Sequence, residues 1–423
     1  MAAAITEAWR DREPSLDEVI RKYPEVPPLV IIKTDVSRRG VDFTEAAMDA
    51  VDPQRDATLY RGIYTEKKNA RLPNGFLLRD GTTIITDLIR GAPPEYNGGR
   101  TPYLVDVSGG KVVITDQGRV IEEVVYWPKP DYFDKTTTKG TPMWQTLVAR
   151  PQRVDINIYQ NCDFWKEPEM GCKFCAIAAT YHQHREAKRE FLDYHDVVET
   201  VAEVLKQPGR LRMIQLCAGS ILTGDELLDD EVDQYVKLLR LLGELFAEKK
   251  VLTQLIATAY NERQLRRLYG ETILTGYTAD IEVLDEKLFN YICPGKAKYI
   301  GYEGWKNRLY KAVEIFGPNA VNTGIVSGVE LIQPEGFRTE EEALEKCLAQ
   351  AEELARHGVS AAQTIFRVAP GSPLKKQKAA SLDYLIAFAR GLDEQQRKYH
   401  LEASFDDYRT CGNHPNTDLM RIA

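Results

Sequence analysis

The second half of the chain alternates between strand-like and helical patterns of apolar residues. Residues 153–159 alternate apolar and polar side chains, with Val154, Ile156 and Ile158 on one face. Between such segments apolar side chains recur at helical spacing, as in residues 197–205. Alternating strands and helices predict a parallel sheet that is covered by helices. The expected strands are residues 153–159, 211–217, 251–258, 276–283, 320–331 and 360–368.

Six such units are too few to close an eight-stranded barrel. We therefore predict an α/β fold built on a partial (β/α)6 TIM-type barrel, which occupies residues 151–375. In barrels of this kind the chemistry gathers at the carboxyl ends of the strands. A C-terminal extension, consisting of a helix and a tail, is expected over residues 376–423.

The N-terminal part of the chain is turn-rich and predicts a mixed, β-rich domain over residues 1–150, whose role the sequence does not reveal. Gly109 and Gly110 separate two of its strand-like runs and indicate a hairpin. The polar residues 134–140 indicate a linker or a flexible loop. The strand-like runs are residues 29–33, 103–107, 111–115 and 120–126.

Composition narrows the class of protein. The hydrophobic share is 43% and the charged share 28%, as in ordinary globular chains. A net charge of −8 argues against a broad basic face for nucleic acid. No apolar run reaches the ~20 residues of a membrane helix, and residues 1–23 lack the layout of a signal peptide. We therefore expect a cytoplasmic protein that does not bind membranes, and nucleic acid is not its expected partner.

Three of the seven cysteines lie in one loop directly after the first predicted barrel strand. They are Cys162, Cys172 and Cys175. Three thiolates can hold three irons of a [4Fe–4S] cube, whose usual complement is four cysteines, and the fourth iron is then open to a ligand that is not protein. Two alternatives stay open: half of a zinc site that His182 and His184 complete, or a redox CxxC pair.

The loop resembles the cysteine motif of the radical S-adenosylmethionine superfamily, whose common form is C-x3-C-x2-C. The C-x9-C-x2-C spacing found here is similar to that of the catalytic subunit of Elongator. The resemblance covers about residues 153–375 and includes a barrel like that of biotin synthase. It implies a [4Fe–4S] cluster on the three cysteines, a bound S-adenosylmethionine, and Phe174 beside that cofactor.

The second and fourth strands carry further segments that resemble the superfamily. Ala218, Gly219 and Ser220 stand where its glycine-rich motif binds the amino group of the cofactor, although by themselves they indicate only a tight turn. Asp280 and Glu282 alternate onto one face of a strand. The likeness to biotin synthase implies that they bind the ribose hydroxyls, and otherwise they are acids at a solvated strand end.

The remaining cofactor residues follow from the same resemblance. Lys306 or Arg308, on a predicted helix, would pair with the methionine carboxylate, or both belong to a solvated helix face. Residues 323–330 resemble the superfamily's G-x-I-x-G-x-x-E segment, and residues 364–372 an arginine-then-Pro-Gly ending. These segments imply that the adenine is contacted by Val326, Gly328 and Phe366.

Four cysteines lie outside the loop. Cys347 is on the apolar stripe of a helix, Cys217 ends the second strand, and Cys293 is in a turn. Cys411 lies in a tail whose Gly412 and Asn413 can turn it back over the barrel. There it would be a catalytic residue that contacts the substrate or returns a hydrogen atom, unless the tail is frayed.

These features predict an enzyme that reductively cleaves S-adenosylmethionine to a 5′-deoxyadenosyl radical, which abstracts hydrogen from a small molecule or cofactor precursor. An electron donor such as flavodoxin or ferredoxin is implied. One alternative is a radical enzyme that modifies RNA, which requires a basic stripe near the cluster. The other is a non-catalytic zinc or iron–sulfur module with a fourth protein ligand. The basic candidates for such a stripe are Lys188, Arg189, Arg210 and Arg212.

Overall fold

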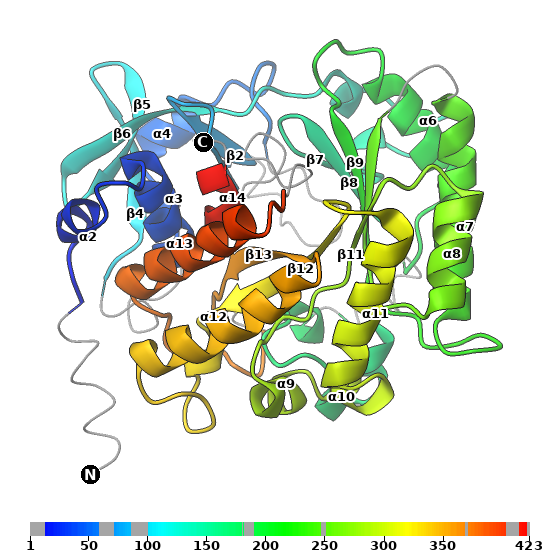
Figure 1. Cartoon of the computed structure of the whole chain (residues 1–423). Coiled ribbons are helices and arrows are strands. Elements are labelled where there is room, and N and C mark those ends of the chain that lie inside the picture. Colours follow the sequence, from blue (N-terminus) through cyan, green and yellow to red (C-terminus); the bar gives the residue numbers. More distant parts are fainter. Residues whose placement is uncertain are drawn as a thin grey trace.

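The computed structural model describes residues 13–58, 72–85, 100–179, 181, 190–246, 251–368, 371–402 and 414–420. A parallel sheet that is covered by helices dominates it (Figure 1). Six parallel strands follow the order β8-β9-β10-β11-β12-β13, and the short β7 pairs antiparallel with β8. The predicted partial (β/α)6 barrel is therefore confirmed. The strands are β7 Val148–Ala149, β8 Arg153–Asn157, β9 Met213–Cys217, β10 Leu252–Ile256, β11 Gly276–Thr278, β12 Val321–Ser327 and β13 Ser360–Ile365.

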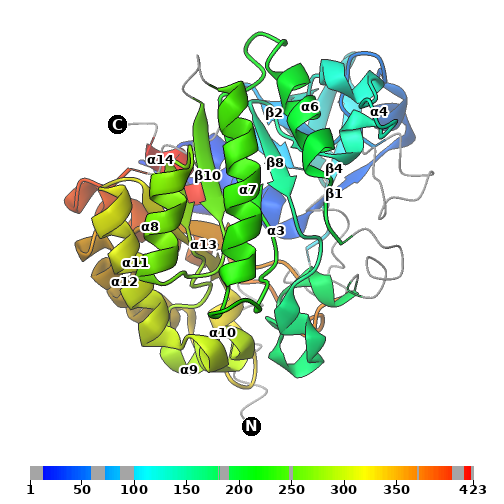
Figure 2. The same cartoon turned by 90° about the vertical axis from the view of Figure 1, so that its right-hand side faces the viewer.

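Helices cover the outer face of this sheet, as Figure 2 shows for α7, α8 and α11. On β8 and β9, alternate side chains such as Val154, Ile156, Ile214 and Leu216 join the apolar core beneath the helices. The other side chains of these strands face the inside of the barrel. The helices are α6 Tyr194–Val204, α7 Asp229–Leu245, α8 Glu262–Glu271, α9 Glu286–Ile292, α10 Pro294–Tyr299, α11 Tyr302–Phe316, α12 Glu340–Arg356 and α13 Leu382–Lys398.

The N-terminal region forms a second sheet, with strand order β1-β4-β5-β6-β2-β3. As predicted, Gly109 and Gly110 turn the hairpin between β4 and β5, with φ of 57° and 78°. The polar residues 134–140 are expected as a linker or a flexible loop. They instead contact α6, where the Thr138 backbone N–H donates to Glu199 at 3.0 Å. The strands are β1 Val41–Phe43, β2 Gly75–Leu78, β3 Thr83–Ile85, β4 Tyr103–Ser108, β5 Lys111–Asp116 and β6 Arg119–Tyr126.

The strand predicted at residues 29–33 is wrong. These residues belong to helix α3, Pro28–Arg39, which Pro28 begins at its first position. Most of this helix is buried, from Leu29 to Arg39, so it lacks the polar stripe that marks a surface helix. A short apolar run rich in Val and Ile does not distinguish a buried helix from a strand. Two further helices, α2 Leu16–Lys22 and α4 Glu45–Asp49, flank it.

The N-terminal and C-terminal segments meet at the free edge of the barrel, beside β13 (Figure 1). The C-terminal helix α14, Pro415–Met420, lies along this edge and includes Asn416. The Gln363 backbone N–H donates to Asn416 Oδ1 at 2.8 Å, and Asn416 Nδ2 donates to the Ala361 carbonyl at 2.8 Å. The amide side chain thus pairs with edge groups that a further strand would otherwise satisfy. Leu419 joins the N-terminal apolar core together with Leu382 and Ile386 of α13.

A buried ion pair also joins the two ends of the chain. Lys33 of α3 lies 2.5 Å from Asp418 of α14, and their side chains are 2% and 0% exposed. The other carboxylate oxygen of Asp418 is buried without a hydrogen bond. Loss of one partner would therefore leave the other charge buried and unpaired. Among the described residues, no helix is both long and apolar enough to cross a membrane.

Lys33→Met should lower the free energy of unfolding by about 3–5 kcal/mol, because it leaves the Asp418 carboxylate without its cation. Chemical denaturation measures this. The double variant Lys33→Met/Asp418→Leu should recover most of the loss. Lys22→Met removes an exposed pair with Asp383 and should cost at most about 1 kcal/mol. A similar loss in both single variants would contradict a special role for the buried pair.

Candidate functional site

The cysteine loop leaves the carboxyl end of β8 and lies at the same end of the sheet as α9 and α10 (Figure 2). Two short turns absorb its long first gap, one over Asp163–Lys166 and one over Pro168–Met170. Trp165 in the first packs directly on Gly171, which folds the gap back so that Cys172 returns toward Cys162. Asp163 holds the base of the loop, accepting from Tyr159 Oη and from the Leu222 backbone N–H, both at 3.0 Å.

The three predicted ligand cysteines are half-buried and close enough to act electrostatically on one another. Burial raises the pKa of the Cys162 thiol to about 12, and the neighbouring Cys172 contributes to this rise to a smaller extent. Burial likewise raises the pKa of the Cys175 thiol to about 12, and Cys172 is again its nearest thiol influence. Thiolates in such a site require compensating positive charge, which iron supplies. Among the described residues, no three Cys, His, Asp or Glu side chains are placed to bind a single metal ion. His182 and His184 lie outside the described residues.

The loop after β9 packs tightly against the cysteine loop. A Cβ at Gly219 would overlap the Asn161 carbonyl oxygen and lie 2.5 Å from Cβ of Cys162, so only glycine fits. The Ser220 backbone N–H approaches Cys162 Sγ at 3.4 Å, and its carbonyl accepts from the Asp163 N–H at 2.8 Å. Ala218 and Gly219 are half-buried at this junction. The predicted amino-group motif therefore lies beside the first cluster ligand.

The predicted ribose acids lie at the same end of the barrel, but not on a regular strand. β11 ends at Thr278, and the Thr323 hydroxyl accepts the Ile281 N–H at 2.8 Å in place of a backbone group. Asp280 accepts the Gly324 N–H at 2.6 Å. Glu282 has a φ of 68°, so the expected strand 276–283 and its simple alternation are wrong. Glu282 still acts electrostatically on both Cys172 and Cys175.

Lys296 is a site residue that sequence reasoning missed. Its ammonium donates to Glu282 Oε1 at 2.8 Å and to the Asp280 carbonyl at 2.6 Å, over the ring of Trp305. Burial raises the pKa of Glu282 to about 7, and Lys296 opposes that rise. The lysine comes from the short helix α10, whose sequence Pro-Gly-Lys-Ala-Lys has no apolar stripe to predict a buried cation.

The junction between α9 and α10 packs against the cysteine loop. The Lys173 N–H donates to the Ile292 carbonyl at 2.9 Å. A Cβ at Gly295 would lie 2.5 Å from the Phe164 ring and 2.6 Å from the Met170 carbonyl. Cys293, expected only as a turn residue, is fully buried, and its hydrogen bond with Cys172 raises the pKa of that thiol. The principal influences on Cys162 and Cys175 do not include Cys293.

Glu231, at the start of α7, is a second residue that the sequence did not reveal. Its carboxylate accepts the Ile221 N–H at 2.7 Å and the Tyr260 hydroxyl at 2.5 Å. It is also 3.3 Å from the Thr258 hydroxyl, which is in turn 2.5 Å from Ser220 Oγ. Burial raises the pKa of Glu231 to about 7. The glutamate thereby joins the loops that follow β9 and β10.

The predicted adenine residues come together at the carboxyl ends of β12 and β13. The Val326 N–H donates to the Glu282 carbonyl, and the Phe366 N–H to the Ser327 carbonyl, both at 2.9 Å. Gly328 has a φ of 98° and ends the strand. Phe174, before the third cysteine, is half-buried and packs on the apolar core. These positions agree with the predicted contacts, which themselves stay predictions.

Comparisons with known proteins find distant similarities. No family model matches the chain. The bacteriochlorophyllide c C-7(1)-hydroxylase of Chlorobaculum limnaeum is 22% identical over 311 residues, which are 70% of this chain and 72% of the relative. Among solved structures, a methylornithine synthase shares 15% identity, with coverage of 60% and 70% and a TM-score of 0.40. A radical SAM methyltransferase from Sphaerobacter thermophilus is also 15% identical, with coverage of 95% and 97% and a TM-score of 0.38.

The similar solved structures thus include a radical S-adenosylmethionine enzyme, the class that the cysteine motif resembles. The TM-scores are too low for details of the solved structures to be transferred to it. The assignment of individual residues in this chain therefore rests on its own contacts.

Lys306 and Arg308, the two predicted partners of the methionine carboxylate, lie in different places. Lys306 is engaged by Glu303 at 2.8 Å and by Glu353 of α12 at 3.0 Å, which directs it to the helical layer outside the barrel. Arg308 donates to the Ala259 carbonyl at 2.8 Å, just beyond the carboxyl end of β10. The structure therefore brings Arg308, and not Lys306, toward the site.

Other predicted residues lie elsewhere. Arg210 donates to the Pro128 carbonyl at 3.2 Å, and the Arg212 N–H to that of Gln152 at 2.8 Å. Both precede β9 and are at the opposite end of the barrel from the cysteines, so they form no basic stripe near the loop. Lys188, Arg189 and Cys411 lie outside the described residues. Cys347 is buried in the core, as expected.

Gly219→Ala should prevent correct closure of the cysteine loop, because the new Cβ would overlap the Asn161 carbonyl. We expect most of the bound iron to be lost after anaerobic reconstitution, as measured by iron analysis and absorbance. Gly270→Ala in α8 is the matched control, since its Cβ meets nothing within 4 Å. Equal iron content in the two variants would show that the close approach is unnecessary.

Proposed function

We propose that this chain is a radical S-adenosylmethionine enzyme that holds a [4Fe–4S] cluster on Cys162, Cys172 and Cys175 and binds S-adenosylmethionine at the fourth iron. The observation that carries the proposal is the contact of Gly219 and Ser220 with the first cysteine, at the carboxyl ends of β8 and β9. The three cysteines lie together in one loop and can hold three irons of an iron–sulfur cube, whose positive charge would stabilise their thiolates. When bound, the cluster and its cofactor supply a one-electron reductive cleavage that yields a 5′-deoxyadenosyl radical.

The residues of the chain would position the cofactor. Ala218 to Ser220 offer closely approaching backbone to its amino group, and Val326, Gly328 and Phe366 offer a surface to its adenine. Glu282 would accept hydrogen bonds from the ribose hydroxyls, with Asp280 in support. Since Asp280 already accepts the Gly324 N–H, Glu282 is the stronger candidate.

The methionine carboxylate has two candidate partners. Lys296 is buried next to Glu282 and within electrostatic reach of Cys172. A carboxylate in this position would gain a cation that is already desolvated. Arg308 is half-buried at the adjacent strand end. We favour Lys296, because its ammonium lies on the same side as the second cluster cysteine.

The substrate proposed is a small molecule that binds inside the barrel. Asp155, Gln215 and Gln254 lie side by side on β8, β9 and β10, directly below Cys217 in the register. Gln215 is 7% and Gln254 1% exposed, and their side-chain oxygens have no hydrogen-bond donor. An interior with unpaired acceptors favours a polar substrate over an apolar one. The substrates named for the relatives are not inferred for this chain, given the low identities.

The alternatives gain little support. Modification of RNA would require basic residues near the loop, and the two described candidates lie at the opposite end of the barrel. A structural cluster would require a fourth protein ligand. Cys293 is the nearest extra thiol, but it interacts with Cys172 and not principally with the other two cysteines. A small electron-transfer protein such as flavodoxin or ferredoxin stays the predicted reductant.

With a strong reductant, the anaerobically reconstituted enzyme should convert S-adenosylmethionine into 5′-deoxyadenosine and methionine, slowly in the absence of substrate. Chromatography of the products measures this. Cys172→Ala should abolish the activity by removing a cluster ligand, whereas Cys347→Ala removes a thiol of the helical layer and should retain it. Methylthioadenosine or S-adenosylhomocysteine as the main product would contradict the proposed cleavage.

Glu282→Ala and Lys296→Met should each weaken binding of S-adenosylmethionine about tenfold or more, since each removes a charge-assisted contact. Lys306→Met is the control, because Lys306 is held by α12 outside the site. Titration of the reconstituted variants measures the affinity, and iron analysis must show an intact cluster. If Lys306→Met alone weakened binding, the assignment of Lys296 would be refuted.

A further inference from the structure

The backbone at Gly328 is held by a buried side chain from its own turn. The Gly328 N–H donates to Glu330 Oε1 at 2.8 Å, and the same oxygen accepts the hydroxyl of Tyr384. Glu330 is 3% exposed, and burial raises its pKa. Hydrogen bonds from Tyr384, from the Gly328 N–H and from its own backbone oppose that rise, so the buried carboxyl group depends on them. Tyr384 is fixed in turn, since it is 2% exposed and lies in the first turn of α13.

The start of α13 is held by two separate parts of the chain, α12 and the segment before α2. Ser381 caps the helix, and its hydroxyl and N–H donate to Glu340 of α12 at 2.5 and 2.7 Å. The Leu382 N–H donates to Glu13 Oε1 at 3.1 Å. Glu13 precedes α2, so a carboxylate from the N-terminal region accepts a hydrogen bond at the N-terminus of α13.

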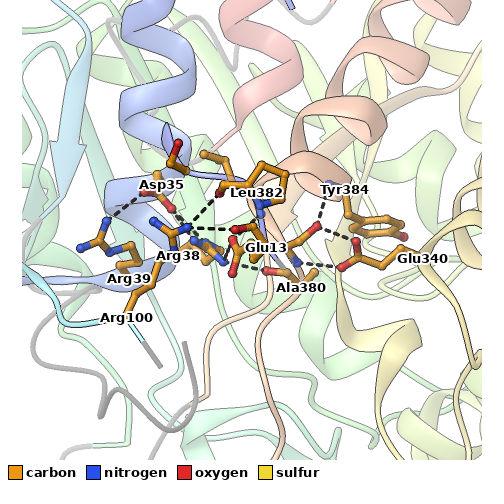
Figure 3. A network of polar contacts seen from close by, with 12 residues as sticks. Glu13, Asp35, Arg38, Arg39, Arg100, Glu340, Ala380, Leu382 and Tyr384 are labelled. Atoms are coloured by element: carbon orange, nitrogen blue, oxygen red, sulfur yellow. Dashed lines mark hydrogen bonds and ion pairs between the residues drawn. The ribbon is translucent and has the colours of Figure 1, made fainter. Parts of the chain in front are cut away.

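Glu13 itself belongs to the buried charge network of Figure 3. Arg38 of α3 lies 2.5 Å from Glu13 and 2.6 Å from Asp35. Both residues of α3 are at most 2% exposed. Arg38 Nη1 also donates to the Ala380 carbonyl at 3.2 Å. Helix α3 is thus hydrogen-bonded directly to the segment that leads into α13.

Two series of contacts lead from the N-terminal network to Gly328. A Cβ at Gly328 would lie 3.1 Å from Cβ of Ala380 and 3.5 Å from Cβ of Phe366. One route runs from Arg38 through Ala380 to Gly328. The other runs from Glu13 through α13, Tyr384 and Glu330 to the Gly328 N–H. Any displacement of the N-terminal network would therefore move the turn after β12, because these contacts are buried and closely packed.

We propose that the N-terminal region positions the adenosyl-binding turn of the barrel, with Glu13, Tyr384 and Glu330 as positioning residues for S-adenosylmethionine. The inference rests on the proposed function in one respect, namely that Gly328 lies at the adenine. Tight docking of the N-terminal region and binding of the cofactor are then linked equilibria. By reciprocity, the cofactor should stabilise this docking to the same degree that docking favours the cofactor.

The test is a set of binding titrations with S-adenosylmethionine on the full-length, reconstituted enzyme. Tyr384→Phe leaves Glu330 without its hydroxyl donor and should raise the dissociation constant about fivefold or more. Glu13→Gln weakens the pairing with Arg38 and should act in the same direction. The effect of the double variant should be clearly less than the product of the single effects, because both act through one connected network.

Tyr399→Phe is the matched control. It removes a tyrosine hydroxyl that donates to Glu352 of α12 at 2.9 Å, at the far end of α13. Thermal unfolding separates stability from positioning, since a general loss of stability would lower the melting temperature without selectively changing affinity. Wild-type affinity in Tyr384→Phe or in Glu13→Gln, with an intact cluster, would overturn the inference. If the wild-type enzyme binds no S-adenosylmethionine at all, the proposed function fails instead.

Discussion

The close approach of Gly219 to Asn161 and Cys162 is the contact on which the site depends. Parallel strands bring their carboxyl ends to one edge of a sheet, but that alone does not order the loops above them. Here the absence of a side chain lets the loop after β9 touch the cysteine loop directly. Glu231 then joins the same segment to the loop after β10. The first cluster ligand and the predicted cofactor-binding backbone are thus fixed relative to each other.

A partial barrel has an open edge, and this chain covers it with its own ends. Asn416 bonds with β13 in the manner of a further strand, and Lys33 pairs with Asp418 across the two termini. The N-terminal region is therefore part of the barrel's environment as well as an added domain. Its buried ion pairs are costly to desolvate, which makes precise pairing a requirement of the fold.

The sequence predicted much of the barrel because its strands bury one face under amphipathic helices, as Val154 and Ile156 do. It also predicted the cysteine loop, since three thiols at close spacing have few uses. It failed at α3, where a helix buried almost throughout carries no amphipathic signal. It did not predict the positive φ of Glu282, because the segment after β11 leaves the regular strand where the Ile281 N–H donates to the Thr323 hydroxyl, 42 positions further along the chain. Lys296, Cys293 and Glu231 were missed for the same reason: only tertiary contacts identify them.

The central claim is a cluster held by three cysteines with one iron left for the cofactor. Mössbauer spectroscopy of protein reconstituted with iron-57 tests it most directly, because it distinguishes irons within one cube. The account predicts one [4Fe–4S] cluster per chain in which a single iron changes its spectrum when S-adenosylmethionine is added. A cube whose four irons are all unaffected by S-adenosylmethionine, or a protein that binds zinc in place of iron, would contradict it.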